Sequence, residues 1–242
     1  MNAISAFHLE GKKGLVLGLA NEHSIAWGCA RQAQAMGAEV VASCLNDKAR
    51  PYVEPLTQSL GMDLQTCNIE TPEELEKLVA YAVAKLGHFD FVIHSIAWAP
   101  LADLHGRVVD SSSTGFARAM EVSCHSFATL AKLCAPHMTQ GGSMVTMTYL
   151  GAAEAVPHYG LMGPVKAALE SLVRYMALEL GPQGIRVYAV SPGPILTRAA
   201  SGIEAFDALM QNNIAKAPLG RLVTLDEIAN LSLFCVPMPP AA

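Results

Sequence analysis

Residues 14–28 read Gly-Leu-Val-Leu-Gly-Leu-Ala-Asn-Glu-His-Ser-Ile-Ala-Trp-Gly, and this stretch decides the fold. Its first six residues are apolar or glycine and predict a buried strand. Gly18 then permits a tight turn, and Ser24 stands where the cap of a following helix is expected. Free N–H groups at the start of such a helix attract the pyrophosphate of a dinucleotide. The spacing differs from Gly-x-Gly-x-x-Gly, so this stretch alone leaves both a structural turn and a cofactor site open.

Short apolar runs alternate with longer helical patterns along the chain. We expect strands at residues 14–19, 39–43, 63–67, 89–94, 143–148 and 185–190. We expect helices at residues 24–36, 51–60, 71–86, 115–137, 164–180 and 224–234. Thr71 and Glu74 are expected to form a capping box at the start of the third helix. This alternation predicts one α/β domain over residues 1–242, with a three-layer, doubly wound parallel sheet.

The composition excludes several classes of protein. Hydrophobic residues make up 52% of the 242 residues and charged residues only 15%, so the chain is able to bury a large core. Its net charge of −5 lacks the basic excess of a nucleic-acid binder. No apolar run approaches the roughly 18 residues of a membrane span, and the N-terminus lacks a signal-peptide pattern. The six cysteines show no metal-ligand spacing, so we expect no metal, reduced thiols and a cytoplasmic protein.

A second stretch, residues 149–166, carries the side chains expected to perform the chemistry. Tyr159 and Lys166 are seven positions apart, whereas ordinary short-chain dehydrogenases use Tyr-x3-Lys, and that lysine position is Gly163 here. Seven residues return to nearly the same helix face, about 10 Å along the axis. We therefore expect Tyr159 at the mouth of the helix that contains Pro164, with Lys166 inside it. A phenol so placed can hydrogen-bond an oxygen that gains charge away from the reacting carbon, and the lysine can hold a cofactor.

Together these motifs resemble the enoyl-acyl-carrier-protein reductases, a divergent branch of the short-chain dehydrogenase/reductase superfamily with a Rossmann fold. The resemblance covers about residues 5–235 and includes residues 94–100, 181–187 and 191–203. It implies reduction of the 2,3 double bond of an enoyl thioester of acyl carrier protein, in fatty acid biosynthesis. It also implies NAD as the cofactor, with NADH preferred over NADPH, and a homotetramer.

The resemblance assigns roles to individual residues. Tyr149, Tyr159 and Lys166 are expected to be catalytic, with Tyr159 holding the enolate oxygen and Lys166 the cofactor ribose. The other residues expected to contact the cofactor are Gly18, Ser24, Ile25, Leu45, Asn68, Ile69, Ser95, Ile96, Ala97, Ile195 and Thr197. The residues expected to contact the substrate are Ala99, Tyr149, Tyr159 and Met162. Residues 197–216 are expected to form a lid over the substrate.

Three departures from the family's usual pattern bear on ligands and on the sheet. Ala97 stands where the family commonly has glycine, and its methyl group predicts weak binding of diaryl-ether inhibitors. Leu45 cannot hydrogen-bond the adenosine ribose, and Lys48 and Arg50 are nearby cations able to attract a 2′-phosphate, although we expect NAD. Residues 236–242 are rich in proline, which cannot continue a central strand, so we expect the sheet to lack the family's seventh strand.

Two other functions stay open from the sequence. One is a short-chain dehydrogenase that acts on another enoyl or carbonyl substrate. The other is a truncated, inactive paralogue that binds nucleotide only. The expected loss of the seventh strand favours the paralogue, whereas the presence of both Tyr159 and Lys166 argues against it. Neither a nucleic-acid nor a membrane partner is expected.

Overall fold

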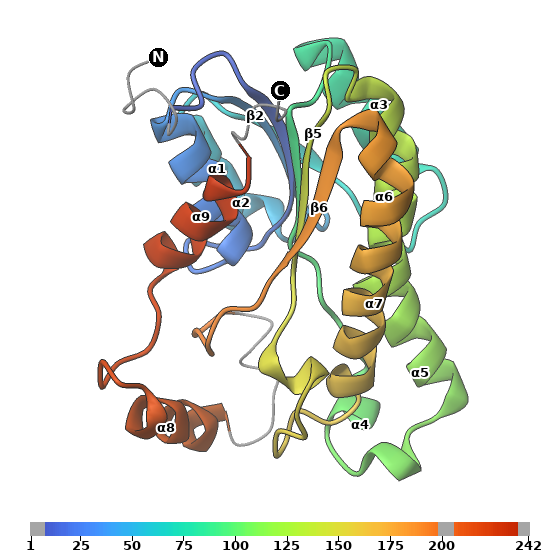
Figure 1. Ribbon diagram of the computed structural model, residues 1–242, viewed down its shortest axis with the longest axis vertical. Helices are drawn as coiled ribbons and strands as arrows, with labels where there is room; N and C mark the ends of the chain where they lie inside the picture. Colours follow the sequence, from blue (N-terminus) through green and yellow to red (C-terminus); the bar gives the residue numbers. More distant parts are fainter. Residues whose placement is uncertain (1–7, 198–205, 237–242) are drawn as a thin grey trace.

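The computed structural model describes residues 8–197 and 206–236, and its centre is a six-stranded sheet (Figure 1). The strands are β1 (Lys13–Leu19), β2 (Glu39–Cys44), β3 (Asp63–Thr66), β4 (Phe91–His94), β5 (Gly142–Met147) and β6 (Ile185–Val190). Every pairing is parallel, and the order is β3-β2-β1-β4-β5-β6. The chain leaves β1 in one direction and returns beside it at β4, so the prediction of a doubly wound parallel sheet is confirmed.

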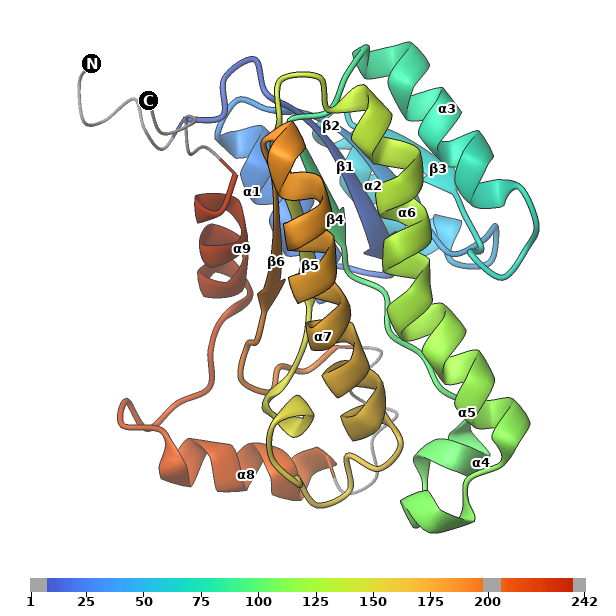
Figure 2. The same cartoon turned by 45° about the vertical axis from the view of Figure 1, so that its right-hand side comes forward.

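Helices cover both faces of the sheet and produce two apolar cores (Figures 1 and 2). One face carries α1 (Ile25–Ala35), α2 (Arg50–Gln58) and α9 (Leu225–Phe234). The other carries α3 (Glu74–Leu86), α6 (Ser126–Cys134) and α7 (Met162–Leu180). Two further helices, α4 (Leu101–Leu104) and α8 (Phe206–Lys216), lie beyond the carboxyl ends of the strands. Four short 3-10 helices connect these elements: η2 (Val108–Asp110), η4 (Ala135–His137), η5 (Leu150–Ala152) and η6 (Gly181–Gln183).

The predicted helix over residues 115–137 is interrupted in the structure. It consists of α5 (Ser113–Met120), a π-helix, η3 (Glu121–His125), and α6. Residues 116–134 contain neither glycine nor proline, so the hydrophobic pattern gives no sign of the break.

The predicted capping box at the start of α3 is wrong. The helix begins at Glu74, and the preceding residue, Glu73, makes no capping hydrogen bond through its side chain. The carboxylate of Glu74 accepts a hydrogen bond of 2.6 Å from the backbone N–H of Asn68 instead. The side chain of Glu74 therefore bonds to the backbone just after β3 and not to that of Thr71, whose carbonyl oxygen still accepts a hydrogen bond from the Glu74 N–H (3.3 Å).

The sheet of the described residues ends at β6, which pairs with β5. Residues 237–242, on which the prediction of a missing seventh strand depends, lie outside the described residues, as do residues 198–205 of the predicted lid. Within residues 8–197 and 206–236, no helix is long and apolar enough to cross a membrane. The same residues hold no group of three or more His, Cys, Asp or Glu side chains placed to bind a metal ion.

Candidate active site

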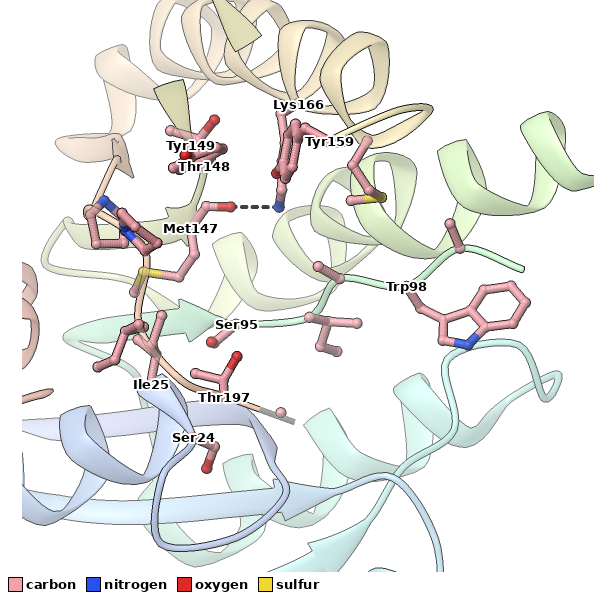
Figure 3. Close-up of a pocket in the computed structure, with 18 of the residues that line it drawn as sticks. Ser24, Ile25, Ser95, Trp98, Met147, Thr148, Tyr149, Tyr159, Lys166 and Thr197 are labelled. Carbon is pink, nitrogen blue, oxygen red and sulfur yellow. Dashed lines mark hydrogen bonds between the residues drawn. The ribbon is translucent and has the colours of Figure 1, made fainter. Parts of the chain in front are cut away.

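A cavity of about 440 Å³ lies at the carboxyl ends of the central strands. Its walls come from the turn after β1, from the segments that follow β4, β5 and β6, and from the start of α7 (Figure 3). Most of the predicted site residues line it, namely Gly18, Ser24, Ile25, Ser95, Ile96, Ala97, Ala99, Tyr149, Tyr159, Met162, Lys166, Ile195 and Thr197. The fold thus brings together segments that are far apart in the sequence.

The turn after β1 approaches the end of β4 very closely. Gly18 has φ +102°, and a Cβ atom on it would lie 2.2 Å from the carbonyl oxygen of Ser95, so only glycine fits. Ser24 occupies the N-cap position of α1, but its hydroxyl group donates to the carbonyl oxygen of Asn21 (2.7 Å) and does not cap the helix. The first N–H groups of α1 thus lack a side-chain cap beside the cavity, which fits an anionic group such as a pyrophosphate.

Three residues predicted to contact the adenosine end lie apart from the cavity walls. Leu45 follows β2 and is more than half exposed, and Asn68 and Ile69 follow β3. The side-chain oxygen of Asn68 accepts a hydrogen bond from the N–H of Glu70 (3.2 Å). Arg50 donates to the carbonyl oxygen of Leu64 (3.1 Å) and pairs with a glutamate on its own helix, so its guanidinium group is already engaged within the protein.

Tyr159 lies in a turn just before α7, between two residues in the left-handed region, His158 (φ 63°) and Gly160 (φ 52°). It therefore stands at the helix mouth, as predicted, but this turn and not a shared helix face sets its position. Its ring lies 4.7 Å from that of Tyr149, measured between centroids, at an angle of 59°. Burial, and to a lesser extent Tyr149, raises the pKa of Tyr159, so the phenol keeps its proton and can donate a hydrogen bond.

Lys166 lies on α7, is buried, and lines the same cavity as Tyr159 (Figure 3). Its Nζ atom donates a hydrogen bond of 2.7 Å to the carbonyl oxygen of Met147, at the end of β5. An ammonium group has three N–H donors, so others remain for a ligand. Burial lowers the pKa of Lys166 to about 8, whereas Cys124 and Glu170 act to raise it. The lysine is therefore mostly charged at neutral pH, at a site where burial makes that charge costly.

The structure adds residues that the sequence analysis missed. The hydroxyl group of Thr148 lines the cavity and donates to Glu170 (2.8 Å), one helical turn beyond Lys166. Asn213 of α8 hydrogen-bonds the side chain of Tyr149, so the predicted lid contacts a predicted catalytic residue. The i,i+4 spacing of Lys166 and Glu170 could have indicated from the sequence that the two side chains lie on the same face of α7. No sequence pattern indicated Asn213.

Comparisons with known proteins identify the family of this chain. The model of a family described as "Enoyl-(Acyl carrier protein) reductase" matches residues 18–237. The chain is 42% identical to enoyl-[acyl-carrier-protein] reductase [NADH] 1 of Rhizobium meliloti, over 93% of this chain and 84% of that protein. It is 41% identical to the corresponding Nostoc enzyme, over 94% of this chain and 90% of that protein.

Solved structures give the same answer. The structure of the enoyl-(acyl-carrier-protein) reductase of Anaplasma phagocytophilum in complex with NAD superposes with a TM-score of 0.90. That alignment has 41% sequence identity and covers 95% of this chain and 88% of the other. The protein described here therefore belongs to the enoyl-acyl-carrier-protein reductase family.

Proposed function

We propose that this protein reduces the 2,3 double bond of enoyl thioesters of acyl carrier protein, with NADH as reductant, in fatty acid biosynthesis. One observation carries the proposal: Tyr159, the buried Lys166 and the turn after β1 all line the same cavity. The relatives from Rhizobium meliloti and Nostoc are named as NADH-dependent enoyl reductases, and the Anaplasma phagocytophilum structure contains NAD.

The cavity has the chemistry that a nicotinamide dinucleotide requires. The first turn of α1 offers backbone N–H groups to the pyrophosphate, and Lys166 offers N–H donors to the nicotinamide ribose. Ile195 and Thr197, after β6, line the end of the cavity where we place the nicotinamide. Leu45, Asn68 and Ile69 are proposed to meet the adenosine end. The bound cofactor supplies the hydride for C3 of the substrate.

Tyr159 and the apolar wall around it serve the substrate. When C3 of an enoyl thioester gains hydride, negative charge develops on the thioester carbonyl oxygen, three bonds away from C3. The protonated phenol of Tyr159 is placed to donate a hydrogen bond to that oxygen, and Tyr149 packs against its ring. Ala99 and Met162 give this part of the cavity an apolar lining suited to an acyl chain. A proton from solvent then reaches C2.

The decisive test is the oxidation of NADH by the purified protein, followed by the decay of its absorbance. We expect turnover with a crotonyl thioester of acyl carrier protein and none with simple ketones at equal concentration. Preferred turnover of ketones would instead indicate a carbonyl-reducing dehydrogenase. Binding of NADH without turnover of either substrate would indicate a protein that only binds nucleotide.

The pH dependence of this reaction should follow the protonation of Lys166. Because its pKa is about 8, the lysine loses its charge as the pH rises through this value, and we expect kcat/KM for NADH to fall above about pH 8. The negative charge of Glu170 raises that pKa, so Glu170→Gln should move the alkaline limb to lower pH. Glu179→Gln, at the exposed end of the same helix, is the matched control and should leave the profile unchanged.

Two titratable groups near Lys166, His94 and Cys124, do not account for the alkaline limb. Burial lowers the pKa of His94 to about 3, so it stays neutral, and burial raises the pKa of the Cys124 thiol. A profile that stays flat through pH 8, or a Glu170→Gln limb that moves to higher pH, would contradict the assignment to Lys166.

We propose further that residues 1–242 form a single domain that assembles as a homotetramer in the cytoplasm. Its assembly is supported by exposed apolar side chains on two outer helix faces. Tyr175 and Leu178 of α7 are 64% and 74% exposed, and Leu231 and Phe234 of α9 are 54% and 51% exposed. Apolar side chains grouped on a helix surface are typical of an interface. Sedimentation analysis should give the mass of four chains, and a monomer would contradict the proposal.

A further inference from the structure

Ser123 is a fully buried serine whose hydroxyl group contacts the backbone of a distant residue, Trp98. Its Oγ atom accepts a hydrogen bond from the N–H of Trp98 and donates one to the carbonyl oxygen of the same residue, each of 2.7 Å. A hydroxyl group has a single proton to donate, and that proton is used here. The two bonds therefore fix both backbone polar groups of Trp98 from one side.

Trp98 belongs to the segment Ser95–Ala99, which forms one wall of the cavity between β4 and α4. Gly18 packs against the first residue of this segment. The segment has no regular secondary structure, so its shape depends on contacts with its neighbours. The contact with Ser123 lies near its far end, and the two contacts together hold it at both ends.

The π-helix Glu121–His125 presents Ser123 to this segment. Insertions of this kind within α-helices are frequent at functional sites because they redirect side chains. Next along it, Cys124 interacts electrostatically with Lys166. Just after it, the Oγ atom of Ser126 lies 2.9 Å from Nε2 of the buried His94, at the end of β4. The interruption of the helix thus faces the same strand end and the same lysine as the cavity.

The side chain of Trp98 is held separately, by Arg118 of α5. The guanidinium carbon of Arg118 lies 4.4 Å from the centre of the indole ring, a cation–π contact. Both carboxylate oxygens of Glu70 accept hydrogen bonds from the same guanidinium group. Figure 3 shows the indole directed away from Tyr159 and Lys166. Backbone and side chain of one residue are therefore fixed from two sides.

We propose that Ser123 is a positioning residue that, by holding Trp98, keeps the segment Ser95–Ala99 in the shape that binds the cofactor. The inference deepens the proposed function and rests on it, because Ser95, Ile96 and Ala97 are expected to contact the cofactor. Ser123 itself touches neither cofactor nor substrate and acts through this segment.

The two hydrogen bonds between Ser123 and the backbone of Trp98 are called the clamp below. The fluorescence of Trp98 reports on this clamp directly, without any ligand. The chain has two tryptophans, so Trp27→Phe leaves Trp98 as the sole tryptophan, and excitation at the long-wavelength edge of indole absorption leaves the tyrosines unexcited. In that background, Ser123→Ala should increase the quenching of Trp98 fluorescence by acrylamide in the ligand-free protein. It should also raise KM for NADH about tenfold, with a smaller change in kcat, because the loop must be ordered again on binding.

Three further variants sharpen the test. Ser123→Cys keeps a weak donor and acceptor of similar size, so its KM should lie between those of the parent and Ser123→Ala. Ser232→Ala is the matched control, because Ser232 is equally buried but lies on α9, where it donates to a carbonyl oxygen of its own helix (2.8 Å) and hydrogen-bonds Cys29 of α1. It should change neither quenching nor KM. Arg118→Gln alters a half-exposed side chain, leaves the fold intact and should also increase the quenching.

The outcomes separate the possibilities. Equal KM values for NADH in Ser123→Ala and Ser232→Ala, or quenching of Ser123→Ala at the parent level, would overturn the proposal. If Ser123→Ala yields less folded protein but the folded fraction keeps the parent's KM for NADH, the role of Ser123 is purely structural, and the proposal is also overturned. If the parent protein does not oxidise NADH with an enoyl thioester, the proposed function fails, whereas the quenching comparison still reports on the clamp.

Discussion

Tyr159→Phe should lower kcat for the enoyl thioester by about a hundredfold to a thousandfold and leave KM for NADH nearly unchanged. The substitution removes only the hydroxyl group, which is proposed to donate to the thioester oxygen as that oxygen gains charge. Loss of one such donor typically has an effect of this size. The ring remains, so its packing against Tyr149 at 4.7 Å is preserved. Steady-state kinetics with NADH and a crotonyl thioester measures both parameters.

A matched substitution separates this chemistry from a general effect of removing a phenol. Tyr52 lies on α2, is 63% exposed and does not line the cavity, so Tyr52→Phe should keep the parent's kcat. If Tyr159→Phe retains more than about a tenth of the parent's kcat, the phenol is not the principal donor to the developing charge.

Lys166→Met should raise KM for NADH about a hundredfold. The methionine keeps a flexible apolar stem of similar length but lacks the ammonium group, so the charge-assisted hydrogen bonds proposed to the cofactor ribose are lost. Each such bond contributes about 1.5 kcal/mol or more. The melting temperature at pH 7 should not fall, because burial of the lysine charge, which lowers its pKa to about 8, is relieved. Titration of NADH and thermal unfolding measure the two effects.

Lys132→Met is the control for replacing a lysine in a helix, since Lys132 is exposed on α6. It should leave KM for NADH at the parent value. An unchanged KM in Lys166→Met would assign the ribose contact to another group. A large loss of thermal stability in that variant would instead show that the bond to the carbonyl oxygen of Met147 is mainly structural.

The order of the six strands and of the helices between them was predictable because each of these elements carries its own local pattern. β6 was predicted with its observed bounds, and the other predicted strand and helix ends lie within a few residues of those observed, apart from the helix over residues 115–137. The helices α4 and α8, beyond the carboxyl ends of the strands, were not predicted. Parallel strands joined by helices allow few arrangements, so the doubly wound sheet followed from the alternation alone. The role of Gly18 was also predictable, because a tight turn directly after a buried strand requires a glycine.

The errors arise where contacts from elsewhere in the chain compete with a local pattern. Glu74 left the predicted capping box because the free N–H of Asn68 lies within its reach. The π-helix replaced regular α-helix beside Trp98, which Ser123 contacts across 25 positions of the sequence. The cap of α1 differs for a local reason, because the hydroxyl group of Ser24 donates to the carbonyl oxygen of Asn21, three residues earlier.

The sequence by itself therefore determined the layered fold and the family, and it indicated Tyr159 and Lys166 as the candidate catalytic pair, because these depend on local periodicity and on short motifs. Only the tertiary structure decided which groups surround that pair. The charge of Glu170, the carbonyl oxygen of Met147 and the clamp of Ser123 on Trp98 come together through packing of separate elements. Their effect depends on the distances between groups and on burial, and neither quantity can be derived from the order of the residues.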